Sequence, residues 1–90
     1  MSRNPIKVTK TQINFDQNPL RINFIDIETS HSVFLLYNAT GRLIDQFYLN
    51  GEKELILSHY KYPSGLYLYR LKNEKLDIRG KHLIVNDYFP

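Results

Sequence analysis

The side chains in this sequence that could perform chemistry are few and lie far apart. The three histidines, His31, His59 and His82, belong to separate segments, and their spacing is not that of a metal site. The chain contains no cysteine, which excludes disulfides, thiolate metal ligands and a cysteine nucleophile. We therefore expect no metal ion and no cofactor.

Other catalytic arrangements are equally hard to find. Asp26, Asp45 and Asp77 have no glutamate at a spacing that favours general acid–base catalysis. Ser58 precedes His59, but adjacency in sequence does not make a nucleophile and its base, and no carboxylate is evident to orient the imidazole. A glycine-rich phosphate loop is also missing. We expect that the protein is not an enzyme.

Length and charge limit the remaining classes of function. A chain of 90 residues has room for one domain with one core. The net charge is +3, but acidic residues alternate with the basic ones, and no run holds more than two adjacent cations. This scatter predicts no one-sided basic stripe, and we expect no nucleic-acid partner.

The sequence also lacks the features of a membrane-inserted protein. Its first residues, MSRNPIKVTKTQ, have no apolar centre of the kind found in a signal peptide. No apolar run approaches the length of a membrane span. If the protein is exported, its export signal therefore lies outside these residues.

The elements that carry these side chains are predicted to be strands. Tyr, Phe, Ile, Val and Thr are frequent, and apolar residues alternate with polar ones over Leu20, Ile22 and Phe24. Residues 33–37 are apolar on both parities, which predicts a central strand covered on both faces or nearly so. Hairpin turns are predicted at residues 38–41 and, through its Asn-Gly pair, at residues 50–53.

The second half of the chain continues this pattern. Residues 63–65 are predicted to form a tight corner, followed by a strand with Tyr67, Tyr69 and Leu71 on one face. A last strand over residues 76–86 contains Gly80, where an interior glycine predicts a bulge. About seven short strands joined by tight turns indicate an all-β fold, an immunoglobulin-like β-sandwich of about seven short antiparallel strands.

Four short motifs occur in order along this pattern. They are Asn18-Pro19, residues 38–42 (NATGR), residues 63–67 (PSGLY) followed by Arg70, and residues 81–85 (KHLIV). Each one alone is weak, because turns containing Gly or Pro are common. In this order and at these intervals, from Phe15 to Asn86, they resemble the type A C-terminal sorting domain of the type IX (Por) secretion system of Bacteroidetes.

The resemblance implies a domain at the C-terminus of a longer cargo protein. Residues 1–14 would be a leading strand or a linker from that cargo, residues 15–86 the sorting domain and residues 87–90 a short tail. The cargo would reach the periplasm first, and the outer-membrane translocon would then recognise the domain. A sortase-like protease would remove the domain, and the cargo would be secreted or attached to the cell surface.

The candidate recognition residues come from these motifs. The last strand, if it lies at a sheet edge, could accept a strand from a partner or from a second copy of the chain. The alternative is an immunoglobulin-like adhesion or carbohydrate-binding module whose contact platform would be Tyr60, Tyr62, Tyr67 and Tyr69. The recognition residues predicted for the sorting role are Asn18, Pro19, Gly41, Arg42, Pro63, Gly65, Tyr67, Lys81, Leu83 and Val85.

Overall fold

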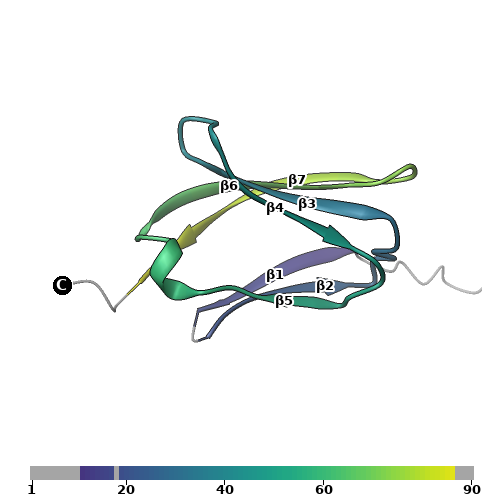
Figure 1. The fold of residues 1–90 in the computed structure, drawn as a ribbon, viewed down its shortest axis with the longest axis horizontal. Helices are drawn as coiled ribbons and strands as arrows, with labels where there is room; N and C mark the ends of the chain where they lie inside the picture. The colour runs from purple at the N-terminus through teal and green to yellow at the C-terminus, as the bar shows by residue number, and fades with distance from the viewer. Residues whose placement is uncertain (1–10, 18, 87–90) are drawn as a thin grey trace, which may run out of the picture.

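Two antiparallel β-sheets pack face to face in the computed structural model, which describes residues 11–17 and 19–86 (Figure 1). The three-stranded sheet has the order β1 (Gln12–Gln17), β2 (Leu20–Ile25), β5 (Glu54–Ile56). The four-stranded sheet has the order β4 (Leu43–Leu49), β3 (Ser32–Asn38), β6 (Gly65–Lys72), β7 (Asp77–Ile84). A short 3-10 helix, η1 (His59–Lys61), precedes β6. The predicted sandwich of about seven short antiparallel strands is confirmed.

The core lies between the sheets and is built by alternate residues of each strand. On β2, Leu20, Ile22 and Phe24 are buried, as their alternation predicted. On β3, Phe34 is fully buried, and its ring meets that of Phe24 edge to face at 5.5 Å between centroids. These contacts between inner faces hold the two sheets together.

β3 is central in its sheet but is not covered on both faces. It lies between β4 and β6, so the central position is confirmed. Phe34 and Leu36 point inward and are buried, whereas Val33, Leu35 and Tyr37 on the outer face are only half-buried. The expected cover on both faces is wrong, because one sheet packs against the inner face and only neighbouring side chains shield the outer one.

The Asn-Gly pair at residues 50–51 does not close a hairpin. Gly51 has a φ of +102°, which suits a tight turn, but the chain then crosses to the other sheet. The amide of Phe24 donates to the Lys53 carbonyl at 2.9 Å, and the amide of Leu57 donates to the Leu20 carbonyl at 2.8 Å. The hairpin prediction fails here because pairing with β2 takes β5 away from β4.

Gly80 does not form a bulge either. The β6–β7 pairing keeps its register from Gly65 to Lys72, and Gly80 lies opposite Tyr69. A Cβ atom on Gly80 would stand only 2.5 Å from Cζ of the Tyr69 ring. The glycine is therefore required because this ring, which packs near Phe15 and Phe34, covers its backbone.

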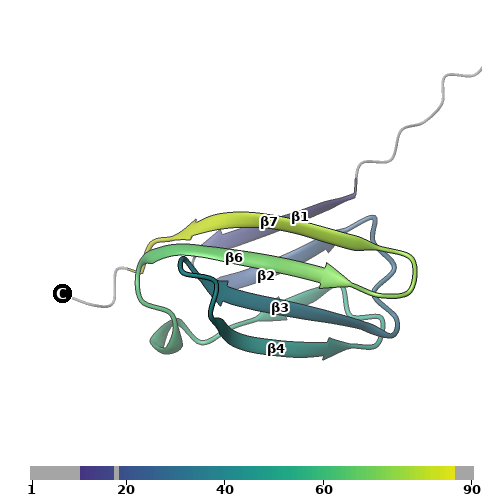
Figure 2. The same ribbon diagram turned by 90° about the horizontal axis from the view of Figure 1, so that it is seen from above.

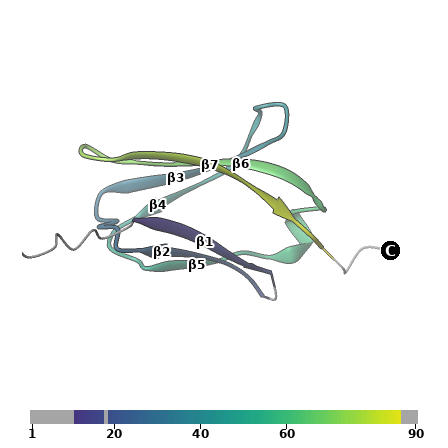
Figure 3. The same ribbon diagram turned by 180° about the vertical axis from the view of Figure 1, so that it is seen from behind.

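The β3–β4 hairpin rises away from the sandwich on the outer side of the four-stranded sheet (Figure 1; Figure 3). The side chain of Asn38 accepts hydrogen bonds from the backbone amides of Thr40, at 3.0 Å, and Arg42, at 2.9 Å. Gly41 has a φ of +91°, a conformation that glycine adopts at little cost. The turn predicted at residues 38–41 is confirmed.

Candidate recognition surface

The structure separates the predicted recognition residues into two groups. Asn18 lies outside the described residues. One group gathers at the end of the sandwich where β7 ends, which we call the C-terminal end (Figure 1; Figure 3). It comprises Pro19, Pro63, Gly65, Tyr67, Leu83 and Val85. The other group, Gly41, Arg42 and Lys81, lies toward the raised β3–β4 hairpin and the outer face of β7.

A hydrogen-bonded corner anchors the end of β7. The amide of Asn86 donates to Ser64 Oγ at 2.7 Å, and the Asn86 side-chain amide donates to the Tyr62 carbonyl at 3.1 Å. Asn86 is buried, so these bonds satisfy polar groups that have left water. The corner before β6 and the residue after β7 are thereby tied to each other.

Tyr67 supports this corner from the inside. Its side chain is buried, and its hydroxyl donates to the Pro63 carbonyl at 2.8 Å. Burial raises the pKa of the Tyr67 hydroxyl above its usual value. Tyr67 therefore positions the corner and offers little surface to a partner.

The tyrosine platform expected for a carbohydrate-binding module is not formed. Tyr62 and Tyr67 are buried, and Tyr69 faces the core, where its ring packs near Phe34. Tyr60 is 75% exposed and therefore does not share one exposed surface with the three tyrosines that are turned inward. Tyr67 and Tyr69 point inward because alternate residues of β6 fill the core.

The last strand lies at a sheet edge, as predicted. β7 pairs with β6 on one side and with no described strand on the other. The amide of Asn73 donates to the Leu76 carbonyl, which fixes the alternation of hydrogen-bonded pairs along the β6–β7 ladder. It follows that the backbone groups of Asp77, Arg79, Lys81 and Leu83 point away from β6, toward the open edge.

Gln17 covers the far end of this edge. β1 runs beneath β7 on the same side of the sandwich (Figure 2). The Gln17 side chain accepts from the Val85 amide at 3.3 Å and donates to the Leu83 carbonyl at 3.4 Å. One glutamine thus occupies the two backbone groups that a neighbouring strand would use, whereas the edge from Asp77 to Lys81 stays open within the described chain.

His82 belongs to the same contact. Its ring stacks on Phe15 at 4.2 Å between centroids, and its Nε2 lies 2.9 Å from Gln17 Nε2. Burial lowers the pKa of His82, which favours the neutral ring that can accept a hydrogen from Gln17. The histidine therefore packs against Phe15 and helps to position Gln17.

The outer side of β7 carries apolar and charged side chains in separate stretches. Near the C-terminal end, Leu83 is 58% exposed and Val85 is 49% exposed. Leu66 of β6 lies directly opposite Leu83 and extends this apolar surface. Exposed apolar side chains of this size next to an open edge are typical of contact surfaces.

Basic residues that are scattered along the sequence lie together on one face of the folded domain. Alternate residues of neighbouring strands share a face, so cations from β6 and β7 point outward together. The expectation that no one-sided cationic surface exists is therefore wrong. The outward-facing cations of these two strands are Arg70, Lys72, Arg79 and Lys81, and the outward-facing carboxylate is Asp77.

Asp77 forms ion pairs with two of these cations. Arg70 donates to its carboxylate through Nε and a terminal nitrogen, each at 2.8 Å, and Arg79 lies 3.3 Å from the same carboxylate. These hydrogen bonds hold the pKa of Asp77 well below its usual range. Lys81 makes no ion pair with any described residue.

Gly41 and Lys81 meet at a shallow groove between the raised hairpin and the outer face of β6 and β7. Its volume is about 540 Å³, and Tyr37, Leu68 and Arg79 also line it. The groove gathers residues from three strands, but no pair of its side chains forms a nucleophile with a base.

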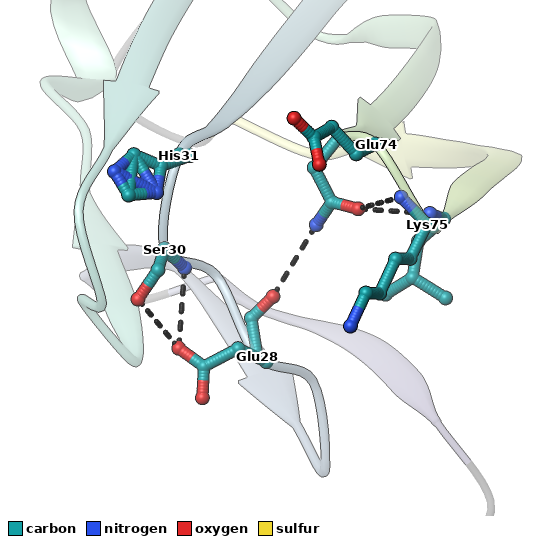
Figure 4. Close-up of a pocket in the computed structure, with 7 residues that line it drawn as sticks. Glu28, Ser30, His31, Glu74 and Lys75 are labelled. Atoms are coloured by element: carbon teal, nitrogen blue, oxygen red, sulfur yellow. Dashed lines mark hydrogen bonds between the residues drawn. The ribbon is translucent and has the colours of Figure 1, made fainter.

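A second hollow lies at the opposite end of the sandwich, between the β2–β3 loop and the β6–β7 turn (Figure 4). Glu28 uses its carboxylate to accept from the hydroxyl of Ser30 at 2.6 Å, and Asn73 donates to the Glu28 carbonyl at 3.4 Å. These hydrogen bonds to Ser30 lower the pKa of Glu28. The polar groups that line this hollow form hydrogen bonds within the local turns.

Neither a metal site nor a membrane span is found in the described part of the chain. Among the side chains that the structure describes, which leave out that of His59, no three of His, Cys, Asp or Glu lie close enough to hold a metal ion. None of the helices in these residues is long and apolar enough to cross a bilayer.

Sequence reasoning missed several residues that shape this surface. Gln17 and His82 have ordinary strand contexts, and nothing in their spacing indicates that they meet across the sandwich. Arg70 was part of a motif, but its partnership with Asp77 becomes visible only through the β6–β7 register. The one sequence signal for the turn between β6 and β7 was the Asn in residues 72–75. The side chain of Asn73 accepts hydrogen bonds from two backbone amides there.

Comparison with known proteins gives one assignment. The family model described as the secretion system C-terminal sorting domain matches residues 4–86. A search of curated proteins found no match.

Proposed function

This chain belongs to the family of secretion system C-terminal sorting domains, which mark proteins for export through the type IX secretion system of Bacteroidetes, and we propose that the export machinery recognises its folded surface. Membership implies interaction with that machinery and with an N-terminal cargo, and export to the cell surface or beyond it. The family is not a catalytic one.

The observation that best supports a folded signal is the position of β7. It is an edge strand, and the outward backbone groups of Arg79 and Lys81 have no described partner. A partner that adds a strand to such an edge gains affinity from main-chain hydrogen bonds and depends little on side chains. This mode of recognition suits a label that is shared by many dissimilar cargo proteins.

The remaining recognition residues act in this proposal by shaping what surrounds β7. Lys81, Leu83 and Val85 would contact the partner directly, since their side chains are exposed on the outer face. The turns would set the outline around the strand. The corner before β6, which Tyr67 supports from within, lies beside the C-terminal end of β7, and the raised β3–β4 hairpin lies beside its outer face. The described residues of these turns are Pro19, Gly41, Arg42, Pro63 and Gly65, and Asn18, predicted to share the turn of Pro19, lies outside the described residues.

The proposal extends to the route and to the processing of the cargo. Residues 1–14 would connect the cargo to the sorting domain, which would comprise residues 15–86, and residues 87–90 would be its tail. The cargo would pass through the periplasm to the outer-membrane translocon. A sortase-like protease would then detach the domain, and the cargo would be released or attached to the surface.

A reporter fusion tests the sorting role. Residues 1–90 are fused behind a fluorescent protein that carries its own export signal, and the fusion is expressed in hosts with and without the translocon. We expect fluorescence outside the cell or on its surface only in the host that has the translocon. The same reporter without residues 1–90 should stay inside both hosts.

The opposite result would reject the role. If the fusion remains in the periplasm of a host whose translocon exports its own substrates, the domain is not a sufficient signal. A reporter that escapes equally from both hosts would show that export does not depend on the translocon.

A further inference from the structure

We propose that the open edge of β7 selects a partner strand that carries acidic side chains on the face it shares with Arg79 and Lys81. The inference rests on the proposed function for its setting and names the chemistry of the partner. It can be tested in solution without the secretion machinery, so its failure would leave the sorting role standing.

The backbone defines where such a strand would lie. Outward-pointing backbone groups run from Asp77 to Leu83, and Gln17 already bonds the Leu83 carbonyl and the Val85 amide. An added strand would therefore pair first with the open stretch around Arg79 and Lys81. To extend further it would have to displace one glutamine side chain, which makes weak bonds of 3.3 and 3.4 Å.

The side chains along this stretch carry surplus positive charge. Arg70 and Arg79 lie directly opposite each other, an arrangement in which like charges repel. The carboxylate of Asp77 offsets part of this positive charge. Its two short contacts are with Arg70, and the side chain of Arg79 stays 67% exposed. Lys81 has no described carboxylate partner. Arg79 bonds Asp77 only over 3.3 and 3.5 Å and keeps most of its side chain exposed, so it and Lys81 can both approach an acidic ligand from adjacent outward positions.

Because strands are pleated, the charges on β7 predict a sequence pattern for the partner strand. Side chains at every second residue of an added strand share a face and stand beside those of β7. Acidic residues two positions apart would therefore lie next to Arg79 and Lys81, and an apolar residue two positions further would lie next to Leu83. The expected motif is acidic–any–acidic–any–apolar, in either direction.

The same charges argue against a second copy of β7 as the occupant. Another copy would bring Arg79 and Lys81 together with the carboxylate of Asp77, which its own Arg70 already holds in two hydrogen bonds. A membrane surface fits less well than a peptide, because lipid headgroups cannot pair with the directed backbone groups of a strand edge. The observations therefore favour an acidic peptide strand.

Peptide binding to the 90-residue chain tests the inference. The probes are the fluorescein-labelled peptide Val-Thr-Glu-Thr-Glu-Thr-Val and its matched control Val-Thr-Gln-Thr-Gln-Thr-Val, measured by fluorescence anisotropy. Because two exposed charge pairs are each worth up to about fivefold in affinity, we expect the glutamate peptide to bind about tenfold more tightly. Salt should reduce this preference.

Variants and amide signals locate the site. Lys81→Glu should abolish the preference for glutamate, whereas Lys53→Glu, the same charge change on an exposed residue beside β5, should preserve it. In nuclear magnetic resonance spectra, the amides of Arg79 and Lys81 should shift on binding. Signals of the buried Leu71 report that each variant is folded, and Lys81→Gln serves in place of Lys81→Glu if that variant unfolds.

Three results would overturn the inference. They are equal binding of the two peptides, amide shifts that avoid β7, and equal shifts of the same amides with vesicles of anionic phospholipid. The last result would assign the charged edge to a lipid surface instead.

Discussion

At the scale of single residues, the strongest steric constraint is the contact between Gly80 and Tyr69. The Tyr69 ring occupies the space that a side chain on Gly80 would need, since Cζ lies 2.5 Å from the position of a Cβ atom. Gly80→Ala should therefore displace the ring and lower the free energy of unfolding by about 1–3 kcal/mol. Urea denaturation measures the change.

A double mutant separates this contact from a general effect of alanine in β7. In a Tyr69→Leu background the space beside Gly80 is open, so adding Gly80→Ala should cost much less. An equal loss in both backgrounds would show that the ring is not the reason for the glycine.

A second prediction at this scale concerns Tyr62. Burial raises the pKa of its hydroxyl well above the usual value, and the hydrogen bond to Asp45 at 2.5 Å raises it further. The folded state thus favours the neutral phenol. Its contribution to stability is complete below the pKa of about 10 in the unfolded chain and is lost as the pH rises above that value.

Denaturation at several pH values tests the predicted loss of stability as the pH rises. The free energy of unfolding of the natural chain should fall as the pH rises above about 10. In Tyr62→Phe the fall should be smaller, although the variant starts from a lower stability because Asp45 loses a hydrogen bond. An identical pH dependence in both proteins would refute the assignment to Tyr62.

At the scale of elements, the end of β7 depends on a side chain from the other sheet. Gln17 bonds the Val85 amide and the Leu83 carbonyl. Gln17→Ala should speed hydrogen exchange at the Val85 amide about fivefold, while the global stability changes by less than about 1 kcal/mol. Gln46→Ala, on the outer face of β4, is the matched control and should leave this amide unaffected. Unchanged exchange in Gln17→Ala would mean that the amide is protected by another group.

The elements also show where sequence patterns were sufficient and where they were not. Alternation placed β2 and the inner face of β6 correctly, because period-two burial is a local property of a strand. The Asn-Gly turn and the interior Gly80 were misread. Each has a local appearance typical of a hairpin or bulge, but its role is decided by a distant partner, β2 in one case and Tyr69 in the other.

At the scale of the whole molecule, the candidate surface was only partly predictable. The motif residues marked the C-terminal part of β7 and the hairpin beside its outer face, and the strand is at an edge as expected. The cationic outer face was not foreseen, because Arg70 and Arg79 become neighbours only when β6 and β7 pair. Sequence order alone could not place their charges on one side.

The fold accounts for how a small sorting domain can be recognised by its outline. Packing fixes the outline through the buried residues of both sheets, while the edge of β7 and the raised hairpin remain available to a partner. Removing residues 81–90 is an unsuitable test of this idea, because Ile84 and Asn86 in that segment are buried. A single substitution on the open edge is more informative.

Export of a Lys81→Pro reporter fusion is the most direct measurement. Proline removes the one outward amide of Lys81, which β6 does not use, so the domain should stay folded while an added strand loses a hydrogen bond and meets the ring. Ile56→Pro makes the same change on the outward side of β5, at the edge of the other sheet. We expect Lys81→Pro to stop export and Ile56→Pro to preserve it. Export of a folded Lys81→Pro fusion at the natural level would contradict recognition through the edge of β7.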